Sequence, residues 1–323
     1  MRIVLTDITE RKQAETELRI AATAFESQDG IMVTDIQGVI LRVNRAFTRI
    51  TGYTAEEAVG RTPHLLSSGR HDAAFYAAMW EHILRTGAWQ GEIWNRRKNG
   101  DVFPERLTIT AVKGDAGEVT HYVGMMHDIT ARKQAEEQIR ALAFYDTLTQ
   151  LPNRRLLNDR LEQAMAASKR SGRYAALMFL DLDNFKPLND TYGHDVGDLL
   201  LVEAAHRLIG CVREMDTVAR FGGDEFMVML GELDVDKAES ATQAGIVAEK
   251  IRAALAKPYV LKLEHEMKAE TAVEHHCTSS IGVVLFINHA ASTEEIIKWA
   301  DIAMYQAKEA GGNLIRFHDS AGA

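Results

Sequence analysis

Residues 220–226 read RFGGDEF, and the apolar stretch from Met227 to Leu230 follows them directly. The two adjacent glycines form a turn pair that admits positive φ at both positions, so this segment predicts a β-hairpin. Asp224 and Glu225 then lie just past the hairpin tip. The sequence therefore predicts two carboxylates side by side on a rigid turn.

A second acidic cluster follows an apolar run of strand length, Ala175 to Leu180, which delivers Asp181-Leu182-Asp183 at its end. Charged side chains at a strand end seldom serve the core. If the RFGGDEF hairpin lies beside this strand, three or four carboxylates converge on one point, which is costly unless hard cations neutralise them. The two clusters together predict a Mg²⁺ or Mn²⁺ site.

The whole chain has the composition of a packed protein of two or three domains. It has 323 residues, of which 46% are hydrophobic and 26% charged. The longest apolar runs have seven residues, so no membrane span is expected, and no secretion signal precedes them. Cys211 and Cys277 stand apart without a CxxC pair, which favours the cytoplasm. A net charge of −9 disfavours nucleic acid as a partner.

A repeat marks the domain boundaries. Residues 5–19 read LTDITERKQAETELR and residues 126–140 read MHDITARKQAEEQIR, a spacing of one domain length. In both copies a short strand ends at Asp-Ile-Thr, and Thr9 or Thr130 is placed to cap a charged helix. We therefore expect residues 1–19 to be the tail of an upstream module with its connecting helix, and residues 131–145 to form a signalling helix.

Apolar residues recur at spacings of four and three along both helices. They are Ala14, Leu18, Ala21 and Phe25 in the first copy and Ala135, Ile139 and Leu142 in the second. Two interpretations fit this seam: a helix packed on its own domain, or a parallel dimeric coiled coil that carries a signal.

Between the two copies, short strand-like stretches alternate with turns. Gly30 to Asp35 and Val39 to Val43 form one expected hairpin, and Trp89 to Arg96 and Val102 to Val112 form another, with a helical patch from His71 to Arg85 between them. With motifs such as VNRAF at residues 43–47 and GEIWNRRKNG at residues 91–100, the segment 20–130 resembles a PAS sensor domain. The resemblance implies an antiparallel sheet with flanking helices.

A PAS resemblance leaves the ligand open. Haem, with His64 or His71 as an axial ligand, and flavin, flanked by Trp89 and Trp94, are both candidates, as are a small metabolite and a domain without a ligand. These histidines could equally be surface or packing residues, and these tryptophans could fill the core.

The second half carries further motifs in a fixed order. They are DTLTQLPNR at residues 146–154, YGHDVGD at residues 192–198, SIG at residues 280–282 and the helix ADIAMYQAK at residues 300–308. Together with RFGGDEF, they make residues 146–318 resemble a GGDEF domain of the diguanylate cyclase family. The resemblance implies an α+β fold with a nucleotidyl-cyclase-like palm, in which helices surround a central sheet. It also implies that two GTP molecules are condensed into cyclic di-GMP.

The resemblance assigns roles to the acidic residues. Asp181, the carbonyl of Leu182 and Asp224 would hold two Mg²⁺ or Mn²⁺ ions per active site. Glu225 would be a further catalytic or metal-binding acid. Metal-assisted displacement by a 3′-hydroxyl on the α-phosphate of GTP is the reaction that such a site performs.

It also assigns roles to residues that would contact GTP. Asn189 and Asp198 would bind the guanine edge, because an amide both donates and accepts while a carboxylate accepts from guanine N–H groups. Lys186, as a catalytic residue, and Lys308 would stabilise phosphate charge, with Arg220 adding to this. His194 would lie near the substrate.

A product-binding site and one departure complete the resemblance. Arg213 and Asp216 match the RxxD motif at which the family binds cyclic di-GMP as an inhibitor, away from the active site. Charges at such spacing also occur on solvated turns. After Lys308 the family commonly has Gly-Arg-Asn, whereas this chain has Gly311-Gly312-Asn313, which implies slightly weaker substrate binding.

If each domain holds one GTP, ring closure requires two domains that face each other, so a homodimer is expected. The end of the chain resembles a junction with a downstream EAL phosphodiesterase domain. The competing function is therefore a GTP-binding module that does not cyclise but regulates such a domain. A polymerase-like palm would fit the carboxylates, but the negative charge disfavours it.

Overall fold

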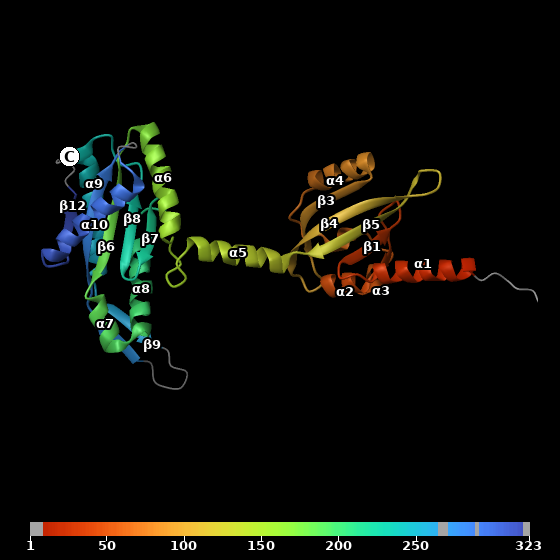
Figure 1. Cartoon of the computed structure of the whole chain (residues 1–323), viewed down its shortest axis with the longest axis horizontal. Helices are drawn as coiled ribbons and strands as arrows, with labels where there is room; N and C mark the ends of the chain where they lie inside the picture. The colour runs from red at the N-terminus through yellow and green to blue at the C-terminus, as the bar shows by residue number, and fades with distance from the viewer. Residues whose placement is uncertain (1–8, 264–270, 288–290, 319–323) are drawn as a thin grey trace, which may run out of the picture. The chain divides into compact units, whose positions relative to one another are not determined.

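The computed structural model describes residues 9–263, 271–287 and 291–318. The chain divides into two compact units between Glu137 and Gln138, and each is described by itself. Unit 1 holds the elements from α1 to the start of α5, and unit 2 holds the elements from α6 to β12 (Figure 1).

Unit 1 is built on a five-stranded sheet in the order β2-β1-β5-β4-β3. Every neighbouring pair of strands is antiparallel. The strands are β1 (Gly30–Thr34), β2 (Ile40–Val43), β3 (Ala88–Arg96), β4 (Val102–Lys113) and β5 (Val119–Asp128). Both hairpins expected from the sequence are confirmed.

Short helices pack against this sheet around a core that contains Phe47, Ile83 and Met126. They are α2 (Arg45–Thr51), α3 (Ala55–Ala58), the 3₁₀ helix η1 (Pro63–Leu66) and α4 (Ala73–Thr86). The longer helix α1 (Thr9–Phe25) precedes β1, and its described side chains are mostly exposed. The patch predicted as helical from His71 begins two residues later, because the Asp72 side chain accepts a hydrogen bond from the Phe75 amide and caps α4.

The helix α5 (Thr130–Phe144) leaves β5 through a side-chain cap. Asp128 Oδ1 accepts hydrogen bonds from the Thr130 amide and hydroxyl at 2.9 and 2.6 Å. The predicted cap at Thr130 is therefore wrong: Thr130 is the first helical residue, and Asp128 supplies the acceptor because its carboxylate reaches the free amides of the first turn. In the first copy, the strand end at residues 5–8 and the Thr9 cap lie outside the described residues.

The apolar seam of α5 has no partner within the described chain. No residue of α5 is buried, and Ile139 and Leu142 are 66% and 64% exposed. Packing on its own domain therefore does not account for this seam. In α1, the side chains of Ala14, Leu18 and Ala21 lie outside the described set, and Phe25 packs beneath the guanidinium of Arg42.

Unit 2 is built on a five-stranded sheet in the order β12-β11-β6-β8-β7, in which only β11 and β12 are parallel among the described strands. Its strands are β6 (Ala175–Asp183), β7 (Thr217–Gly222), β8 (Glu225–Leu230), β11 (Thr278–Phe286) and β12 (Ile315–Phe317). A separate hairpin is formed by β9 (Tyr259–Leu263) and β10 (Thr271–His275).

Helices cover both faces of this sheet, as Figure 1 shows. They are α6 (Arg154–Ser171), α8 (His194–Ile209), α9 (Lys237–Leu255) and α10 (Thr293–Glu309). The helix α7 (Phe185–Tyr192) follows β6 and contacts α8. Successive β6 residues alternate: Met178 and Leu180 pack with α8 and α9, whereas Leu177 and Phe179 pack with α6 and α10. The α+β class, with an antiparallel sheet in unit 1 and a helix-covered sheet in unit 2, is confirmed.

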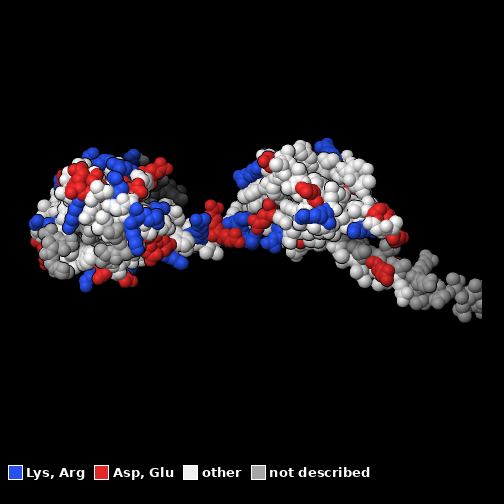
Figure 2. Space-filling view, turned by 90° about the horizontal axis from the view of Figure 1, so that it is seen from above, with Lys and Arg blue, Asp and Glu red and all other residues white. Residues whose placement is uncertain are grey.

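On the face in Figure 2, basic and acidic side chains are interspersed. Among the described helices, none combines the length and apolar composition that a bilayer span requires.

Candidate functional site

The two acidic clusters meet at one end of β6. This strand pairs with β8, and the register places Asp181 directly opposite Glu225. The Leu182 amide donates a hydrogen bond to the Asp224 carbonyl at 3.3 Å. Asp181, Leu182 and Asp183, predicted to follow the strand, lie inside it, because β8 and β11 on either side continue to pair with the backbone. The predicted neighbourhood of hairpin and strand is confirmed.

The hairpin turn is locked by Arg220. Its Nε and Nη2 donate to the Gly223 carbonyl at 3.0 and 2.8 Å, and its Nη1 donates to both carboxylate oxygens of Asp146 at 3.0 and 3.2 Å. Gly223 has a φ of +53°, whereas Gly222 lies outside the left-handed region, so only one glycine of the pair needs positive φ. All three guanidinium nitrogens of Arg220 are engaged inside the chain, so Arg220 positions the hairpin turn. Its expected contact with phosphate stays a prediction.

A lysine from α10 reaches the acidic pair. Lys308 Nζ donates to Asp181 Oδ1 at 2.8 Å, although the Lys308 side chain is 47% exposed. Burial lowers the pKa of Lys308, but the hydrogen bond to Asp181 and the nearby carboxylates outweigh it and raise the pKa overall. Lys308 therefore stays charged and holds one of the predicted metal ligands.

Both acids of the register pair are electrostatically strained. Burial raises the pKa of Asp181, the hydrogen bond from Lys308 opposes this, and the charge of Asp224 adds to it. Burial likewise raises the pKa of Glu225, and the charges of Asp181 and Asp224 reinforce the effect. One ammonium group thus only partly relieves the repulsion, which leaves a place where a divalent cation would be favourable.

Asp183 does not join this cluster. Its carboxylate accepts hydrogen bonds from the Thr278 hydroxyl at 2.6 Å, the Ser280 hydroxyl at 2.8 Å and the Asn313 amide at 2.9 Å. Within the described residues, no three acidic, histidine or cysteine side chains are placed to surround a metal. Of the predicted carboxylates, Asp181, Asp224 and Glu225 lie near one another. The prediction is wrong for Asp183, which residues of β11 and of the loop after α10 hold.

The position of Asp183 explains why this chain has Gly312 where the resemblance leads one to expect an arginine. It has a φ of +72°, and a Cβ built on it would lie 3.1 Å from Asp183 Oδ2. A side chain at this position would strain the backbone and crowd the carboxylate that the next residue, Asn313, also binds. The departure is thus a local requirement of the loop.

The residues predicted to bind guanine lie on α7 and α8. Asn189 Oδ1 on α7 is buried and has no hydrogen-bond partner among the described residues. A Cβ built on Gly197 of α8 would fall 1.8 Å from that oxygen, so the glycine makes room for the amide. Asp198 follows Gly197 and is exposed, as are His194 at the start of α8 and Lys186 near the start of α7.

If Asn189 binds the guanine edge of GTP, as the resemblance implies, we expect Gly197→Ala to raise the KM for GTP by about tenfold or more, because the added methyl group would displace Asn189 and remove that hydrogen bond. Steady-state kinetics over a range of GTP concentrations measures the effect. Gly210→Ala at the C-cap of α8 is the control, because its Cβ would meet its nearest atoms at an ordinary 3.6 Å. Equal KM values for both variants would refute the role of Asn189.

Arg213 and Asp216 form a turn that precedes β7. Asp216 Oδ2 accepts from the Arg213 amide at 2.9 Å, and the Asp216 amide donates to the Arg213 carbonyl at 3.0 Å. The Arg213 side chain is exposed. The turn therefore fixes the Asp216 side chain, while the Arg213 side chain extends from the same turn into solvent.

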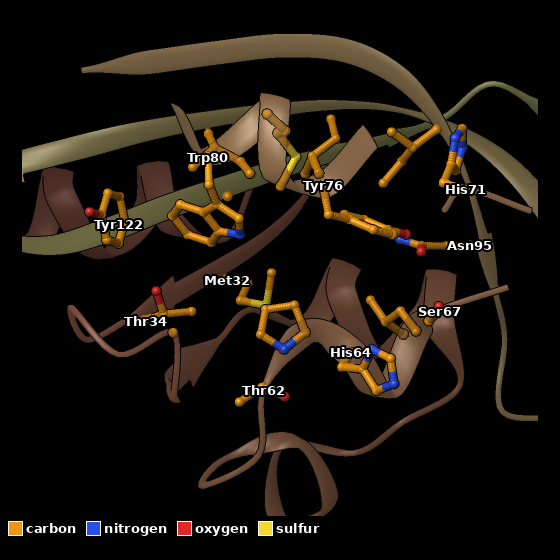
Figure 3. Close-up of a pocket in the computed structure, with 18 of the residues that line it drawn as sticks. Met32, Thr34, Thr62, His64, Ser67, His71, Tyr76, Trp80, Asn95 and Tyr122 are labelled. Atoms are coloured by element: carbon orange, nitrogen blue, oxygen red, sulfur yellow. The ribbon is translucent and has the colours of Figure 1, made fainter. Parts of the chain in front are cut away.

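Unit 1 contains a cavity of about 800 Å³ between the sheet and the helices (Figure 3). His64 and His71 line it, but the Nε2 atom of His71 accepts a hydrogen bond from the Trp94 amide at 3.0 Å. Neither Trp89 nor Trp94 is among the residues that line the cavity in the described chain. The expected flavin sandwich between these two tryptophans has no pocket there, and the lone pair of His71 is already in use.

Comparison with known proteins places both units. Residues 143–314, more than half of the chain, match the family described as "Diguanylate cyclase, GGDEF domain". The chain belongs to the GGDEF family. Residues 28–131 match the PAS domain family, so unit 1 contains a PAS domain and unit 2 a GGDEF domain.

Two curated relatives are similar over different lengths. The "Bifunctional diguanylate cyclase/cyclic di-GMP phosphodiesterase MucR" of Pseudomonas aeruginosa is 40% identical over 59% of this chain and 26% of its own length. The "Cyclic di-GMP phosphodiesterase PdeR" of Escherichia coli is 31% identical over 88% of this chain and 41% of its own length. The chain thus spans less than half of either relative.

Among solved structures, the coiled coil and GGDEF domain of DgcB from Caulobacter crescentus, in complex with c-di-GMP, is similar. It has a TM-score of 0.50 and 27% identity, over 58% of this chain and 93% of that chain.

The PAS domain also holds an acid that the sequence analysis missed. Glu105 of β4 is fully buried, and burial raises its pKa to about 8, although the hydrogen bond from Asn95 opposes the shift. The alternation of β4 could have revealed it, because Glu105 shares one face of the strand with Leu107 and Ile109, which line the cavity.

The stability of the PAS domain should fall as pH rises. Below about pH 4.5 the Glu105 carboxyl is protonated in both the folded and the unfolded chain. Between pH 4.5 and about 8, only the unfolded chain releases this proton. Relative to the Glu105→Gln variant, the native chain should lose free energy of unfolding on the order of 1 kcal/mol per pH unit in this range and no more above it. Unfolding followed by tryptophan fluorescence reports mainly on this domain, which holds Trp80, Trp89 and Trp94. A parallel pH dependence of both proteins would contradict this prediction.

Proposed function

We propose that the GGDEF domain is an active diguanylate cyclase, which condenses two GTP molecules into cyclic di-GMP and two pyrophosphates. The observation that carries the proposal is the acidic pair: Asp181 lies opposite Glu225 in the β6–β8 register, with Asp224 at the adjoining turn. Repulsion between these carboxylates destabilises the folded domain, and a bound metal–nucleotide complex would offset this repulsion.

The proposed metal ligands are Asp181, the Leu182 carbonyl and Asp224, with Glu225 as a further acid. Two carboxylates and a carbonyl fit Mg²⁺ or Mn²⁺, which complete their shells with water and phosphate oxygens rather than with a closed protein cage. Such ions, when bound, make a 3′-hydroxyl a better nucleophile and offset charge on the attacked phosphate. Lys308, which now pairs with Asp181, would turn to a phosphate oxygen as the metal takes over that carboxylate.

The nucleotide would be held from both ends. Asn189 and Asp198 would bind the guanine edge, and the unpartnered Oδ1 of Asn189 supports this. Lys186 would stabilise phosphate charge from the start of α7, and His194 would lie beside the substrate at the start of α8. Arg220 would contribute by fixing the turn that carries Asp224.

Cyclisation requires two such domains, because each active site would hold one GTP and the attacking hydroxyl belongs to the other. We propose a homodimer whose α5 helices pair through Ile139 and Leu142, both exposed in the single chain. The α5 helix would then align the two catalytic domains.

Regulation by the PAS domain would act through the start of α5. Glu105 lies opposite Asp128 in the β4–β5 register. Asp128 pairs with Arg97 through one carboxylate oxygen and holds Thr130 through the other. A change of charge at Glu105 would thus be felt at the cap of the connecting helix.

Feedback by the product would use the turn at Arg213 and Asp216. We expect Arg213→Ala to raise the cyclic di-GMP concentration for half-inhibition by about tenfold or more, because a charge-assisted contact to phosphate is lost. Initial rates without added product should stay within about twofold. Arg170→Ala, an exposed arginine of α6, is the control. An unchanged inhibition curve would show that the motif is only a solvated turn.

A second candidate function is a GTP-binding module that regulates a linked EAL phosphodiesterase without cyclising. It is favoured by the similarity to PdeR, which is named a cyclic di-GMP phosphodiesterase and matches 88% of this chain. The cluster of Asp181, Asp224 and Glu225, which suits metal binding, favours the cyclase.

Chromatographic identification of the nucleotides formed from GTP and Mg²⁺ separates these functions. A cyclase yields cyclic di-GMP. The regulatory module binds GTP, as seen by calorimetry, and returns it unchanged.

A further inference from the structure

One carboxyl oxygen of Glu105 is buried without a hydrogen-bond partner among the described residues. Its Oε1 accepts from Asn95 Nδ2 at 3.0 Å, while its Oε2 is buried and has no partner among the described residues. The side chain is fully buried, and it lines the cavity of the PAS domain. An unpaired buried carboxyl oxygen is costly, so it indicates a missing partner.

The cavity that Glu105 lines also has aromatic and apolar residues in its wall. Tyr76, Trp80 and Tyr122 line the cavity, and the rings of Trp80 and Tyr122 meet edge to face with centroids 5.2 Å apart. Figure 3 shows Tyr122, Trp80 and Tyr76 along one side of the cavity and Met32, Thr62 and His64 along the other. Such a cavity takes a molecule with an apolar body.

The charged residues that line the cavity indicate which charge the polar end of the ligand carries. Asp72 and Glu105 are the acidic residues among those that line the cavity, and no Lys or Arg of the described chain is among them. Anionic groups, such as the propionates of haem or the phosphate of a flavin nucleotide, would therefore find no countercharge. The faces of aromatic rings attract cations, and a buried carboxylate does so more strongly.

We propose that the PAS cavity binds an organic amine, whose ammonium group pairs with Glu105 and whose apolar body lies among Tyr76, Trp80 and Tyr122. A volume of about 800 Å³ accommodates a ring system with a short aminoalkyl arm. Binding holds Glu105 in its ionised form. The inference concerns ligand binding by the PAS domain and stands independently of the cyclase activity.

Three indole compounds that differ in charge test the inference on the full chain. Tryptamine is a cation, tryptophol is neutral and indole-3-acetate is an anion, and all share the ring and a two-carbon arm. By calorimetric titration above about pH 8, where Glu105 is ionised in the folded chain, we expect tryptamine to bind at least about tenfold tighter than tryptophol, since a hydrogen bond between charged groups replaces a neutral one. Indole-3-acetate should bind more weakly than either.

Two variants locate the effect. Glu105→Gln keeps the shape of the side chain and the contact with Asn95, and it should bring tryptamine and tryptophol to similar affinity. Glu81→Gln removes an exposed carboxylate from α4 of the same domain and should leave the preference intact. Equal affinity of the native chain for the three compounds, tighter binding of the anion, or no binding of tryptamine would overturn the inference, whatever the cyclase assay shows.

Discussion

Asp224→Ala and Asp181→Ala should each lower cyclic di-GMP synthesis by about a thousandfold or more. The reason is that metal-assisted charge stabilisation supplies several kcal/mol of the transition-state energy, and each 1.4 kcal/mol is about tenfold in rate. Both carboxylates belong to the acidic cluster at the end of β6. Initial rates with GTP and saturating Mg²⁺ measure the effect.

The fold should survive these substitutions. Because the pKa of Asp181 is raised, its ionised form is disfavoured in the folded chain, and its removal relieves repulsion. Thermal unfolding should therefore match or exceed that of the parent. Glu162→Ala, an exposed carboxylate of α6, is the matched control and should retain full activity. Substantial synthesis by either aspartate variant would refute the assigned metal site.

The second large effect concerns α5. Each inserted helical residue rotates the following chain by about 100°, so two residues after Gln138 turn it by about 200°, whereas seven turn it by about 700°, close to two full turns. If paired α5 helices align the two active sites, two inserted residues should lower activity by up to about a hundredfold, and seven should largely restore it. The measurement is specific activity at protein concentrations at which the parent is dimeric.

Sedimentation should show the same oligomeric state for all insertion variants, which separates misalignment from dissociation. Insertions into the exposed loop at residues 114–117 serve as a control, because they leave α5 unchanged. Equal activity across the α5 series would mean that the helix is a passive tether.

Local sequence patterns predicted much of this architecture. The expected strand from Val102 to Val112, the continuous apolar run of β6 and the turn at Gly223 each depend on residues close in the chain, so their prediction needs no tertiary information. The neighbourhood of Asp181 and Glu225 followed from the assumption that hairpin and strand are adjacent, which the β6–β8 register confirms.

The contacts that were not predicted join residues far apart in the chain. Lys308 reaches Asp181 only because α10 packs on the sheet, and Arg220 is engaged because the loop around Asp146 folds under the hairpin. Similarly, Asp183 is held by residues from β11 and from the loop after α10. The resemblance implies phosphate contacts for Lys308 and Arg220. In the folded chain, Lys308 holds Asp181 and Arg220 holds the turn at Gly223.

The most direct test of the central claim is the ratio of pyrophosphate to cyclic di-GMP formed by the purified chain, with Mg²⁺ and with EDTA. The account predicts two pyrophosphates for each cyclic di-GMP in Mg²⁺, and neither product when EDTA removes the metal, with both restored by added Mn²⁺. Bound GTP that is never converted at saturating Mg²⁺, or synthesis that continues in EDTA, would contradict it.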